Sequence, residues 1–590
     1  MNTPEKLAAL RKAMKQQKVD AFIVFGSDPH MSEYMPTQWQ ERRWISGFTG
    51  SAGWVVITQE KAGLWTDSRY FVQAPIELKN SGIELFKDGV EGTPDYMEWI
   101  GTQLPKNATV AVNALATSHL NWEKLKKSLA VKDIHLTDKP LLDDVWQNRP
   151  DEGDHSIFVH PEKWAGQSVS EKINNIRQKM KVLNTDFHLI TALDEVAWTL
   201  NLRGSDVAYN PVFLGYIALS ENQTFLFAKT EKITEEVARH LKKSNVEWLP
   251  YSDFFNFLSK IKGKRVLLSS NSNQAIFKSL EAENICIEAA SPASLMKAVK
   301  NETELEGFRK VMVRDGVAMV KFLYWLTHQV GKETMTEYSV GQRLRAFRSE
   351  GEHFVGESFG SIVGYEGNGA IVHYSAPETA SKEIFARGSI LVDSGGQYLE
   401  GTTDITRTIP LGEVSQEFID DSTLTLKGMI QLSMVKFPRG TRGVQLDAFA
   451  RMPLWKNAKD YGHGTGHGVG SFMNVHEGPQ NIRKDLNPQE LLPGMVCSNE
   501  PGFYVENQYG IRHENLVAVV PYEKTPYGTF YQFETLTLCP FMPQGINSDL
   551  LTIEEKQWLN DYHQICKEKL EGHLQGDVKQ WFLQIVKPIK

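Results

Sequence analysis

The chain has 590 residues, of which 41% are hydrophobic and 23% charged, and its 64 basic and 72 acidic side chains give a formal net charge of −8. This length predicts about three or four domains, and the ordinary hydrophobic fraction excludes a disordered or fibrous protein. An acidic balance with no block of basic residues gives no electrostatic reason to expect a nucleic acid or an anionic membrane surface as partner.

Cysteine usage and the N-terminus indicate the compartment. The four cysteines form no C-x-x-C pair, which argues against a disulfide framework and against a thiolate zinc site. The first residues lack the apolar core of a secretory signal, and no stretch approaches the roughly 20 apolar residues of a spanning helix. We therefore expect a cytoplasmic protein with reduced thiols and no membrane partner.

Residues 1–155 alternate between helical and strand patterns. Leu7, Leu10 and Met14 recur at helical spacing, and the apolar run 21–25 follows as a buried strand. Two further apolar runs, 53–57 and 62–65, flank a short polar turn and predict a hairpin. The pattern is that of an α/β domain.

Residues 156–300 repeat this organisation. The run 189–198 leads to two apolar segments, 216–219 and 224–227, which again predict a hairpin. The order of the patterns matches that of the first domain, although the residue identity is weak. We therefore predict an internal duplication.

The third domain is predicted over 301–545, followed by a helical extension over 546–590. Thr303 and Glu306 have the spacing of a capping box before a long helical period. Thr552 and Glu555 have the same spacing at the start of the extension.

Four carboxylates in the third domain form two pairs around predicted turns. Asp393 ends the apolar run 389–392, where an acid without a partner would be costly to bury. Asp404 follows in strand-like sequence, and the midpoint between the two acids lies at Tyr398 and Leu399. Antiparallel legs would therefore bring Asp393 and Asp404 face to face.

Glu500 and Glu514 repeat this design, with a midpoint at Asn507 in a turn-like segment. Four converging carboxylates cannot all ionise unless cations neutralise them. A set of oxygen ligands with one imidazole favours hard divalent ions such as Mn²⁺, and bridging carboxylates commonly hold two ions. The alternative is that the four acids lie separately on the surface.

The imidazole candidates lie in residues 462–470, where glycine alternates with other residues and where His463 and His467 occur. Glycine allows the backbone to approach a ligand closely. A dinucleotide-binding loop is the weaker interpretation, because the G-x-G-x-x-G spacing is absent. His373 and His476, taken singly, are typical of buried strand histidines.

These residues resemble, in order and spacing, the metal ligands of the pita-bread metallopeptidases. The motifs are VDSGGQY, TTDITRT, GHGTGHGVG, SNEPGFY and GIRHEN. The rest of the chain resembles the long, three-domain form of aminopeptidase P. The resemblance implies an α/β (α+β) protein, in which two creatinase-N-terminal-like (ribonuclease-H-like) α/β domains precede a C-terminal pita-bread catalytic domain.

The resemblance implies two divalent metal ions per chain, most often Mn²⁺, with Zn²⁺ or Co²⁺ as alternatives. Asp393 would be a terminal ligand, Asp404 and Glu514 would bridge, and His467 and Glu500 would complete the second site. A metal-bridging hydroxide would be the nucleophile, and Glu500 would be the general base.

Further residues match positions around the site of this family. His373 and His463 would hold the scissile carbonyl and stabilise the charge that develops on it, and His476 would lie near the proline pocket. Arg512 would pair with a ligand carboxylate and fix its orientation. Arg69 would reach the substrate region, or else form a structural salt bridge at a domain interface.

His513 departs from the pattern, since an aliphatic residue is usual between the arginine and the bridging glutamate. Its side chain is expected on the opposite face of the strand from Glu514, because alternate residues of a strand point to opposite faces.

The resemblance implies hydrolysis of the N-terminal X-Pro bond of peptides, and a homodimer formed through the third domain. The alternatives are a prolidase, which acts on X-Pro dipeptides, and a non-catalytic pita-bread protein that binds peptides. A metal-free amidinohydrolase of the creatinase type shares the fold but would lack the carboxylate set. Prolidases of this fold also lack the duplicated N-terminal pair of domains.

Overall fold

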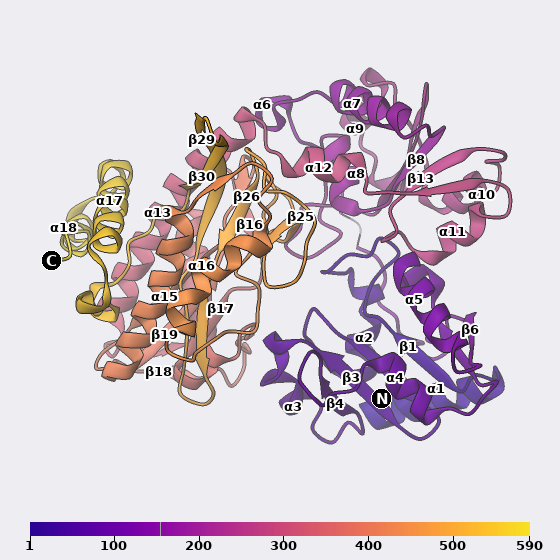
Figure 1. The fold of residues 1–590 in the computed structure, drawn as a ribbon, viewed down its shortest axis with the longest axis horizontal. Helices are drawn as coiled ribbons and strands as arrows, with labels where there is room; N and C mark the ends of the chain where they lie inside the picture. The colour runs from indigo at the N-terminus through magenta and orange to yellow at the C-terminus, as the bar shows by residue number, and fades with distance from the viewer. Residues whose placement is uncertain (154) are drawn as a thin grey trace. The chain divides into compact units, whose positions relative to one another are not determined.

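The computed structural model describes residues 1–153 and 155–590 and divides into two compact units (Figure 1). Unit 1 comprises Met1–His160 and Gln167–Ser294, and unit 2 comprises Pro161–Gly166 and Leu295–Lys590. The division into three domains and a helical extension that the sequence suggested remains a prediction.

Unit 1 contains two six-stranded sheets with the same strand order and polarity. In the first sheet, the order β4-β3-β2-β1-β5-β6 includes an antiparallel pair β1–β2 and a parallel pair β1–β5. Its strands are β1 (Ala21–Val24), β2 (Trp54–Thr58), β3 (Ala62–Thr66), β4 (Glu84–Lys87), β5 (Thr109–Val112) and β6 (His135–Asp138).

The second sheet has the order β12-β11-β10-β8-β13-β14, with β8–β10 antiparallel and β8–β13 parallel. Its strands are β8 (Phe187–Ile190), β10 (Gly215–Ser220), β11 (Thr224–Ala228), β12 (Glu247–Pro250), β13 (Arg265–Leu268) and β14 (Ile285–Glu288). The two sheets have the same topology, which confirms the predicted duplication. The antiparallel pairs β2–β3 and β10–β11 confirm both predicted hairpins.

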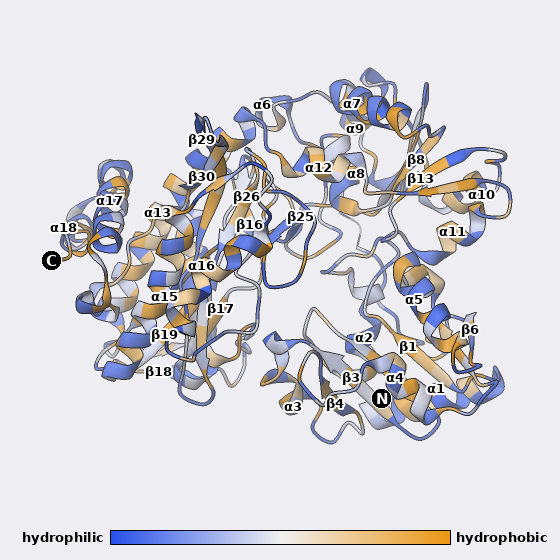
Figure 2. Cartoon of the chain, in the orientation of Figure 1, coloured by the Kyte–Doolittle hydropathy of each residue, from blue (hydrophilic) through white to orange (hydrophobic). Residues whose placement is uncertain are grey.

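The central strands of both sheets are hydrophobic, as Figure 2 shows for β1, β8 and β13, and helices cover them. Strands β7 (Phe158–Val159) and β9 (Leu202–Arg203) form a separate, two-stranded antiparallel sheet. The first helices of unit 1 are α1 (Thr3–Gln16), α2 (Glu41–Ser46), α3 (Gln73–Glu77), α4 (Tyr96–Gln103) and α5 (His119–Ala130). The later ones are α7 (Val169–Val182), α8 (Leu193–Thr199), α9 (Glu235–Lys243), α10 (Phe254–Leu258) and α11 (Gln274–Leu280).

Unit 2 is built on a three-stranded sheet β17-β19-β22 and a six-stranded sheet β23-β30-β29-β26-β24-β25. The strands of these sheets are β17 (Ile362–Tyr365), β19 (Ser389–Ser394), β22 (Ile405–Pro410), β23 (Lys436–Pro438), β24 (Gly466–Gly468), β25 (Glu477–Ile482), β26 (Val496–Asn499), β29 (Asn515–Thr525) and β30 (Gly528–Thr535). Short additional strands are β15 (Met335–Thr336), β16 (Phe354–Glu357), β18 (Glu383–Ile384), β20 (Gly396–Tyr398), β21 (Gly401–Thr402), β27 (Gly502–Val505) and β28 (Tyr509–Arg512).

Helices of unit 2 pack against these sheets through a continuous apolar core. Side chains of α13, α15 and α17 pack there with side chains of β26 and β29. The helices are α6 (Glu162–Ala165), α13 (Glu302–Gln329), α14 (Glu337–Ser349), α15 (Gln416–Met434), α16 (Gly443–Trp455), α17 (Ile553–Leu570) and α18 (Gly576–Ile585), and α12 (Pro292–Ala298) spans the boundary between the units.

One predicted capping box is shifted and the other is confirmed. Helix α13 is capped by Asn301, whose side chain accepts from Glu304 N–H, so the prediction of Thr303 and Glu306 is wrong by two residues. The Asn301 amide also donates to Ala165 O at 2.8 Å, a contact that local spacing cannot reveal. Thr552 and Glu555 form the predicted capping box of α17.

Among the described residues, no helix has both the length and the apolar character needed to cross a membrane. All four cysteines are free thiols; Cys497, Cys539 and Cys566 are buried, and Cys286 is half-buried.

Candidate metal centre

The five predicted ligand residues lie at strand ends of the two sheets of unit 2. Asp393 lies on β19, Asp404 directly precedes β22, His467 lies on β24, Glu500 follows β26, and Glu514 lies between β28 and β29. Asp393, Asp404 and Glu514 are buried, whereas His467 and Glu500 keep partial access to solvent.

The hairpin that carries the aspartates has a different register from the predicted one. Asp393 pairs with Thr406 instead of Asp404, because the legs continue into the ladder β20–β21 and turn at Leu399 and Glu400. The Glu400 carboxylate fixes this tip by accepting from Arg314 at 3.0 Å and by contacting His353 Nδ1 at 2.7 Å. These distant partners shift the turn by one residue and the pairing by two.

The hairpin that carries the glutamates has the predicted register. Asn499 pairs with Asn515 on one side, and Gly502 pairs with Arg512 on the other, in one common register. Glu500 and Glu514 therefore lie opposite each other between the two ladders. Asn507, at the tip, has φ 62°, a conformation that asparagine tolerates better than most residues.

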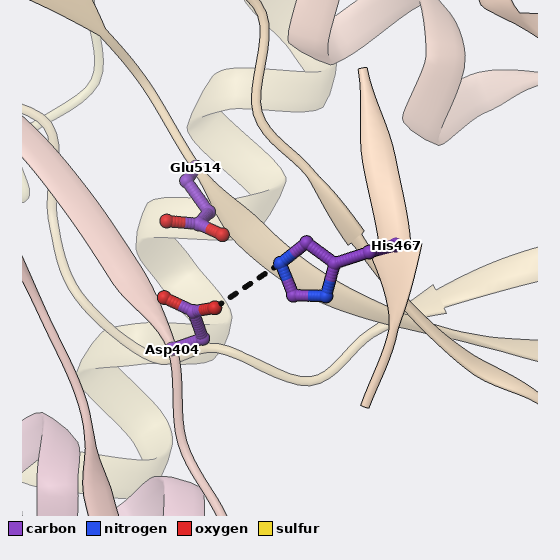
Figure 3. Close-up of side chains that lie close together, drawn as sticks. All are labelled: Asp404, His467 and Glu514. Atoms are coloured by element: carbon purple, nitrogen blue, oxygen red, sulfur yellow. Dashed lines mark ion pairs between the residues drawn. The ribbon is translucent and has the colours of Figure 1, made fainter. Parts of the chain in front are cut away.

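Asp404, His467 and Glu514 point toward one another (Figure 3), and one ligand atom from each lies within 4.8 Å of the others. His467 Nε2 is 3.4 Å from Asp404 Oδ2 and 3.4 Å from Glu500 Oε1. His467 Nδ1 is 2.9 Å from Gly468 O and donates its hydrogen to that carbonyl. This bond directs Nε2 into the carboxylate cluster, as in a metal-ligating histidine.

Ionisation in this cluster is strongly perturbed. Burial raises the pKa of Glu514 well above its usual value, and the three neighbouring carboxylates raise it further. Burial likewise raises the pKa of Glu500 to about 6. Burial disfavours the imidazolium of His467, but the hydrogen bond to Asp404 and the charge of Glu500 outweigh burial and raise its pKa to about 9.

Arg512 is the cation that the protein itself brings to the carboxylates. Its Nη2 donates to Asp393 Oδ2 at 2.5 Å, which agrees with the predicted pairing to a carboxylate. Its Nε donates to Thr406 Oγ1 at 3.3 Å, and the Thr406 hydroxyl donates to Glu514 Oε2 at 2.7 Å. Burial raises the pKa of Asp393, and the Arg512 guanidinium opposes this rise.

The residues present fit a divalent metal site. Four carboxylates face one guanidinium and one imidazole, and Asp393 Oδ1 is buried without a hydrogen-bond partner in the described part of the chain. An oxygen-rich donor set with one imidazole suits hard or intermediate divalent ions, and opposed carboxylates suit two of them. Such ions would supply the missing positive charge.

His463 lies next to this cluster, in contact with a tyrosine. Its Nδ1 is 2.8 Å from Gly464 O, and its Nε2 is 2.7 Å from Tyr504 Oη. Tyr504 Oη also accepts from Arg512 Nη1 at 2.7 Å. His463 is thus linked through Tyr504 to the arginine that holds Asp393.

His476 packs edge to face on His467, with ring centroids 4.4 Å apart. The next residue, Glu477, is buried and accepts from Lys297 Nζ at 2.6 Å and from Lys300 Nζ. Both lysines belong to unit 2, at the start of its main segment. This ionic cluster fixes the backbone next to His476.

The segment that carries His373 is held by Glu337 at the start of α14. The buried Glu337 carboxylate accepts from Tyr374 Oη at 2.7 Å, from Tyr365 N–H at 2.7 Å and from the Asn368 amide at 3.0 Å. Tyr374 is the neighbour of His373, so this anchor limits the movement of the histidine. Among the described residues, the group whose ligand atoms lie within 4.8 Å of one another is Asp404, His467 and Glu514, without His373.

Two further predicted residues bind partners outside the five predicted ligands. Arg69 belongs to unit 1, where it binds Asp67 of its own turn at 2.7 Å and lies 3.9 Å from the Glu33 carboxylate. His513 is buried with its Nε2 3.0 Å from Ser422 Oγ on α15, which places its side chain opposite to that of Glu514, as predicted. Burial and the nearby Arg407 lower the pKa of His513 to about 3.

Sequence reasoning missed three polar residues around the cluster: Tyr504, Thr406 and Ser498. Ser498 Oγ accepts from His467 N–H at 2.9 Å and donates to Glu500 Oε1 at 3.0 Å. A signal existed in strand alternation, because Tyr504, Thr406 and Ser498 each lie an even number of positions from a predicted ligand. Polar residues at such positions share the ligand's face of the strand.

Models of known families match nearly the whole chain. Residues 6–141 and 148–304 each match a model described as creatinase/prolidase N-terminal domain. Residues 306–521 match metallopeptidase family M24, and residues 529–589 match the C-terminal region of that peptidase family.

Full-length relatives carry one activity in their names. "Xaa-Pro aminopeptidase 1" of Dictyostelium discoideum is 39% identical over 99% of this chain and 96% of its own length. "Probable Xaa-Pro aminopeptidase P" of Botryotinia fuckeliana is also 39% identical, over 100% of this chain and 93% of its own length.

Solved structures show the same fold. X-prolyl aminopeptidase of Caenorhabditis elegans, described as a cytosolic enzyme with a di-nuclear active site, is 33% identical, with a TM-score of 0.96 over 100% of both chains. A prolidase of Thermococcus sibiricus, 20% identical with a TM-score of 0.51, covers 64% of this chain and 98% of its own.

We expect Mn²⁺ to bind more tightly as pH rises, because bound cations require Glu500 and His467 without their protons. With pKa values of about 6 and about 9 in the metal-free protein, both groups carry protons at low pH, and binding must release them. Titration calorimetry of the metal-free protein in two buffers of different ionisation enthalpy measures this release. An affinity independent of pH between about 5 and 8, without proton release, would contradict the expectation.

Proposed function

This chain belongs to metallopeptidase family M24, and from that premise we propose that it is an aminopeptidase that removes the N-terminal residue of peptides with proline in second position. The observation that carries the proposal is the cluster of Asp404, His467 and Glu514 in a chain that matches relatives of this name over its whole length. The predicted family and fold class, with two N-terminal creatinase-type domains before an M24 domain, are confirmed.

We propose that Asp393, Asp404, His467, Glu500 and Glu514 hold two divalent ions, with Mn²⁺ favoured over Zn²⁺ or Co²⁺ by the oxygen-rich donor set. The di-nuclear centre named for the similar nematode enzyme supports two ions. Ions bound by these residues would supply Lewis acidity toward water and toward the scissile carbonyl. Arg512 keeps Asp393 in its ligand orientation through the 2.5 Å hydrogen bond.

Glu500 is the proposed general base. Its carboxylate lies 3.4 Å from His467 Nε2, at the edge of the proposed metal site, and can accept a proton from a water held there. It takes a proton from the attacking water and transfers it to the leaving nitrogen. The nitrogen of an X-Pro bond carries no hydrogen, so it must be protonated as the C–N bond breaks.

The proposed role of His373, His463 and His476 is to bind the substrate and to stabilise charge on its carbonyl oxygen. Contact of His476 with His467 and the link from His463 through Tyr504 to Arg512 support a position near the reacting bond. A substrate contact by Arg69 stays a proposal from resemblance alone. The cytosolic enzyme among the similar structures supports a cytoplasmic location.

Prolidase activity is the alternative within the same fold. The similar prolidase covers 64% of this chain, so it has no counterpart for a third of the sequence. A non-catalytic peptide-binding protein is less compatible with five intact ligand residues, because buried carboxylates without metal are costly.

We predict cleavage of an X-Pro-Pro tripeptide at its first bond and a lower kcat/KM on the corresponding X-Pro dipeptide. Mn²⁺-loaded protein is incubated with both peptides and with an X-Ala-Pro control, and mass spectrometry identifies the products. Strict preference for the dipeptide would establish the prolidase alternative. Release of the C-terminal residue instead of the N-terminal one would contradict both the aminopeptidase and the prolidase hypothesis.

We predict that Glu500→Gln lowers kcat by about 10²- to 10⁴-fold, the usual contribution of a general base. The matched control is Glu506→Gln, because Glu506 is exposed in the turn of the same hairpin. Steady-state kinetics are measured together with the metal content of each variant. A Glu500→Gln protein that keeps both its metal and wild-type kcat would refute the assignment.

We also propose a homodimer formed through unit 2. Phe449, Met452 and Trp455 form an apolar stripe on α16, with exposed fractions of 40%, 39% and 46%. Spacing of three residues places them on one helix face, and exposed apolar surface of this kind often marks an association site.

The double variant Met452→Glu and Trp455→Glu is expected to sediment as a monomer in analytical ultracentrifugation, because charges on the stripe would be desolvated in the interface. Tyr527→Glu, at a residue that is 93% exposed, is the matched control and is expected to leave the dimer intact. A wild-type protein that is monomeric at micromolar concentration would contradict the proposal.

A further inference from the structure

Helix α16 presents a buried ion pair to the glycine-rich loop that leads to His467. Asp447 and Arg451 lie one turn apart on this helix, and Arg451 Nε donates to Asp447 Oδ2 at 2.6 Å. Their exposed fractions are 2% and 0%. Neither residue belongs to the proposed ligand or substrate-binding set.

Arg451 binds the backbone of the loop at two residues. Its Nη1 donates to Tyr461 O at 2.6 Å, and its Nη2 donates to His463 O at 2.8 Å. Its guanidinium also lies over the Tyr461 ring, 3.8 Å from the centroid. A planar guanidinium can make all these contacts at once, which a lysine ammonium cannot.

Asp447 extends the contact to Thr465. The Thr465 hydroxyl donates to Asp447 Oδ1 at 2.6 Å. Because a hydroxyl has one hydrogen, the hydrogen bond between Tyr461 and Thr465 must be donated by the Tyr461 hydroxyl. Every hydrogen bond of this network thus has an assigned donor: Tyr461 donates to Thr465, and Thr465 and Arg451 both donate to Asp447.

Besides His463, the network contacts the backbone of Glu500 and the start of the strand that carries His467. Thr465 O accepts from Glu500 N–H at 2.8 Å, so the loop fixes the backbone of the proposed general base. Strand β24, which carries His467, begins at Gly466, directly after Thr465. Thr465 is therefore the point at which the network, Glu500 and the histidine strand meet.

The loop cannot hold this geometry by itself. Glycine alternates with other residues over 462–470, and glycine has the widest conformational freedom of any residue. A buried ion pair contributes little net stability compared with an apolar replacement of similar volume. The hydrogen bonds of this pair to Tyr461 O, His463 O and Thr465 instead fit a role in selecting one loop geometry.

We propose that Asp447 and Arg451 are positioning residues for catalysis and metal binding: Arg451 sets the place of His463 through its backbone carbonyl, and Asp447 sets the place of Glu500 through Thr465. This inference rests on the proposed function of the same site. Displacements of reacting groups by about 1 Å can lower rates about 100-fold, and loss of an outer contact to a metal ligand typically weakens metal binding 10- to 100-fold.

The decisive comparison is Thr465→Val against Thr465→Ser and Thr425→Val. Valine removes the Thr465 hydroxyl at nearly constant volume, and serine keeps it. Thr425 is also fully buried, but its hydroxyl donates to Asp421 O within α15 and has no link to the loop. We expect a decrease in kcat of about tenfold or more with KM within twofold for Thr465→Val, and near wild-type kinetics for the other two variants.

A second measurement separates positioning from stability. Mn²⁺ affinity, measured by calorimetry on folded metal-free protein, is expected to weaken about tenfold in Thr465→Val and in Arg451→Lys. Thermal unfolding of the same metal-free samples reports the folded fraction. Wild-type affinity and kcat in both variants, whatever their melting temperatures, would overturn the proposal and leave the network a structural one.

Failure of the proposed function gives a different result. If the wild-type protein cleaves no X-Pro peptide, the proposed activity is wrong. The positioning role can still be tested, by comparing the Mn²⁺ affinities of Thr465→Val, Thr465→Ser and Thr425→Val. A weakening confined to Thr465→Val supports positioning, and equal affinities reject it.

Discussion

Four carboxylates lie close together in the interior of unit 2, and the rest of the site must compensate for their mutual repulsion. Asp393, Asp404, Glu500 and Glu514 share a site in which the Arg512 guanidinium binds the Asp393 carboxylate. In a medium of low polarity, such charges raise one another's pKa values until protons or cations neutralise them. Beyond the effect of burial, the high pKa of Glu514 and the raised pKa of His467 have the same cause, an excess of negative charge in the site.

Cations can satisfy this requirement only if the ligands keep their places, and the ligands come from strand ends and loops. Buried charged groups outside the ligand set hold these segments: Glu337 beside His373, Arg451 beside His463, and the pair of lysines on Glu477 beside His476. Each anchor joins a helix or helix end to a loop or, for Glu477, to the first residue of a strand. The site is thus rigid because polar side chains bind loop backbone and loop neighbours, which apolar packing cannot do with comparable direction.

Sequence reasoning predicted the elements that depend on local pattern. The duplicated sheets, the hairpins and the register of Glu500 against Glu514 follow from strand alternation and from a turn centred on Asn507. The register of Asp393 was wrong because Glu400, at the true tip, is held by Arg314 and His353, which lie far away in the chain. The N-cap residue of α13, Asn301, was missed for the same reason, because its side-chain amide binds the distant Ala165 O.

The anchors could not be predicted for a different reason. In sequence, Asp447 and Arg451 are an acid and a base one helical turn apart, the usual pattern of a solvated helix face. Only the fold shows that this face contacts residues 461–465 and that both carboxylate oxygens of Asp447 have a donor. Ligand residues leave a motif because the metal restricts their chemistry, whereas an anchor is restricted only by what it must hold. Residues that support a site are therefore found from buried charges with directed partners in the structure, and the ligands they support are found from the sequence.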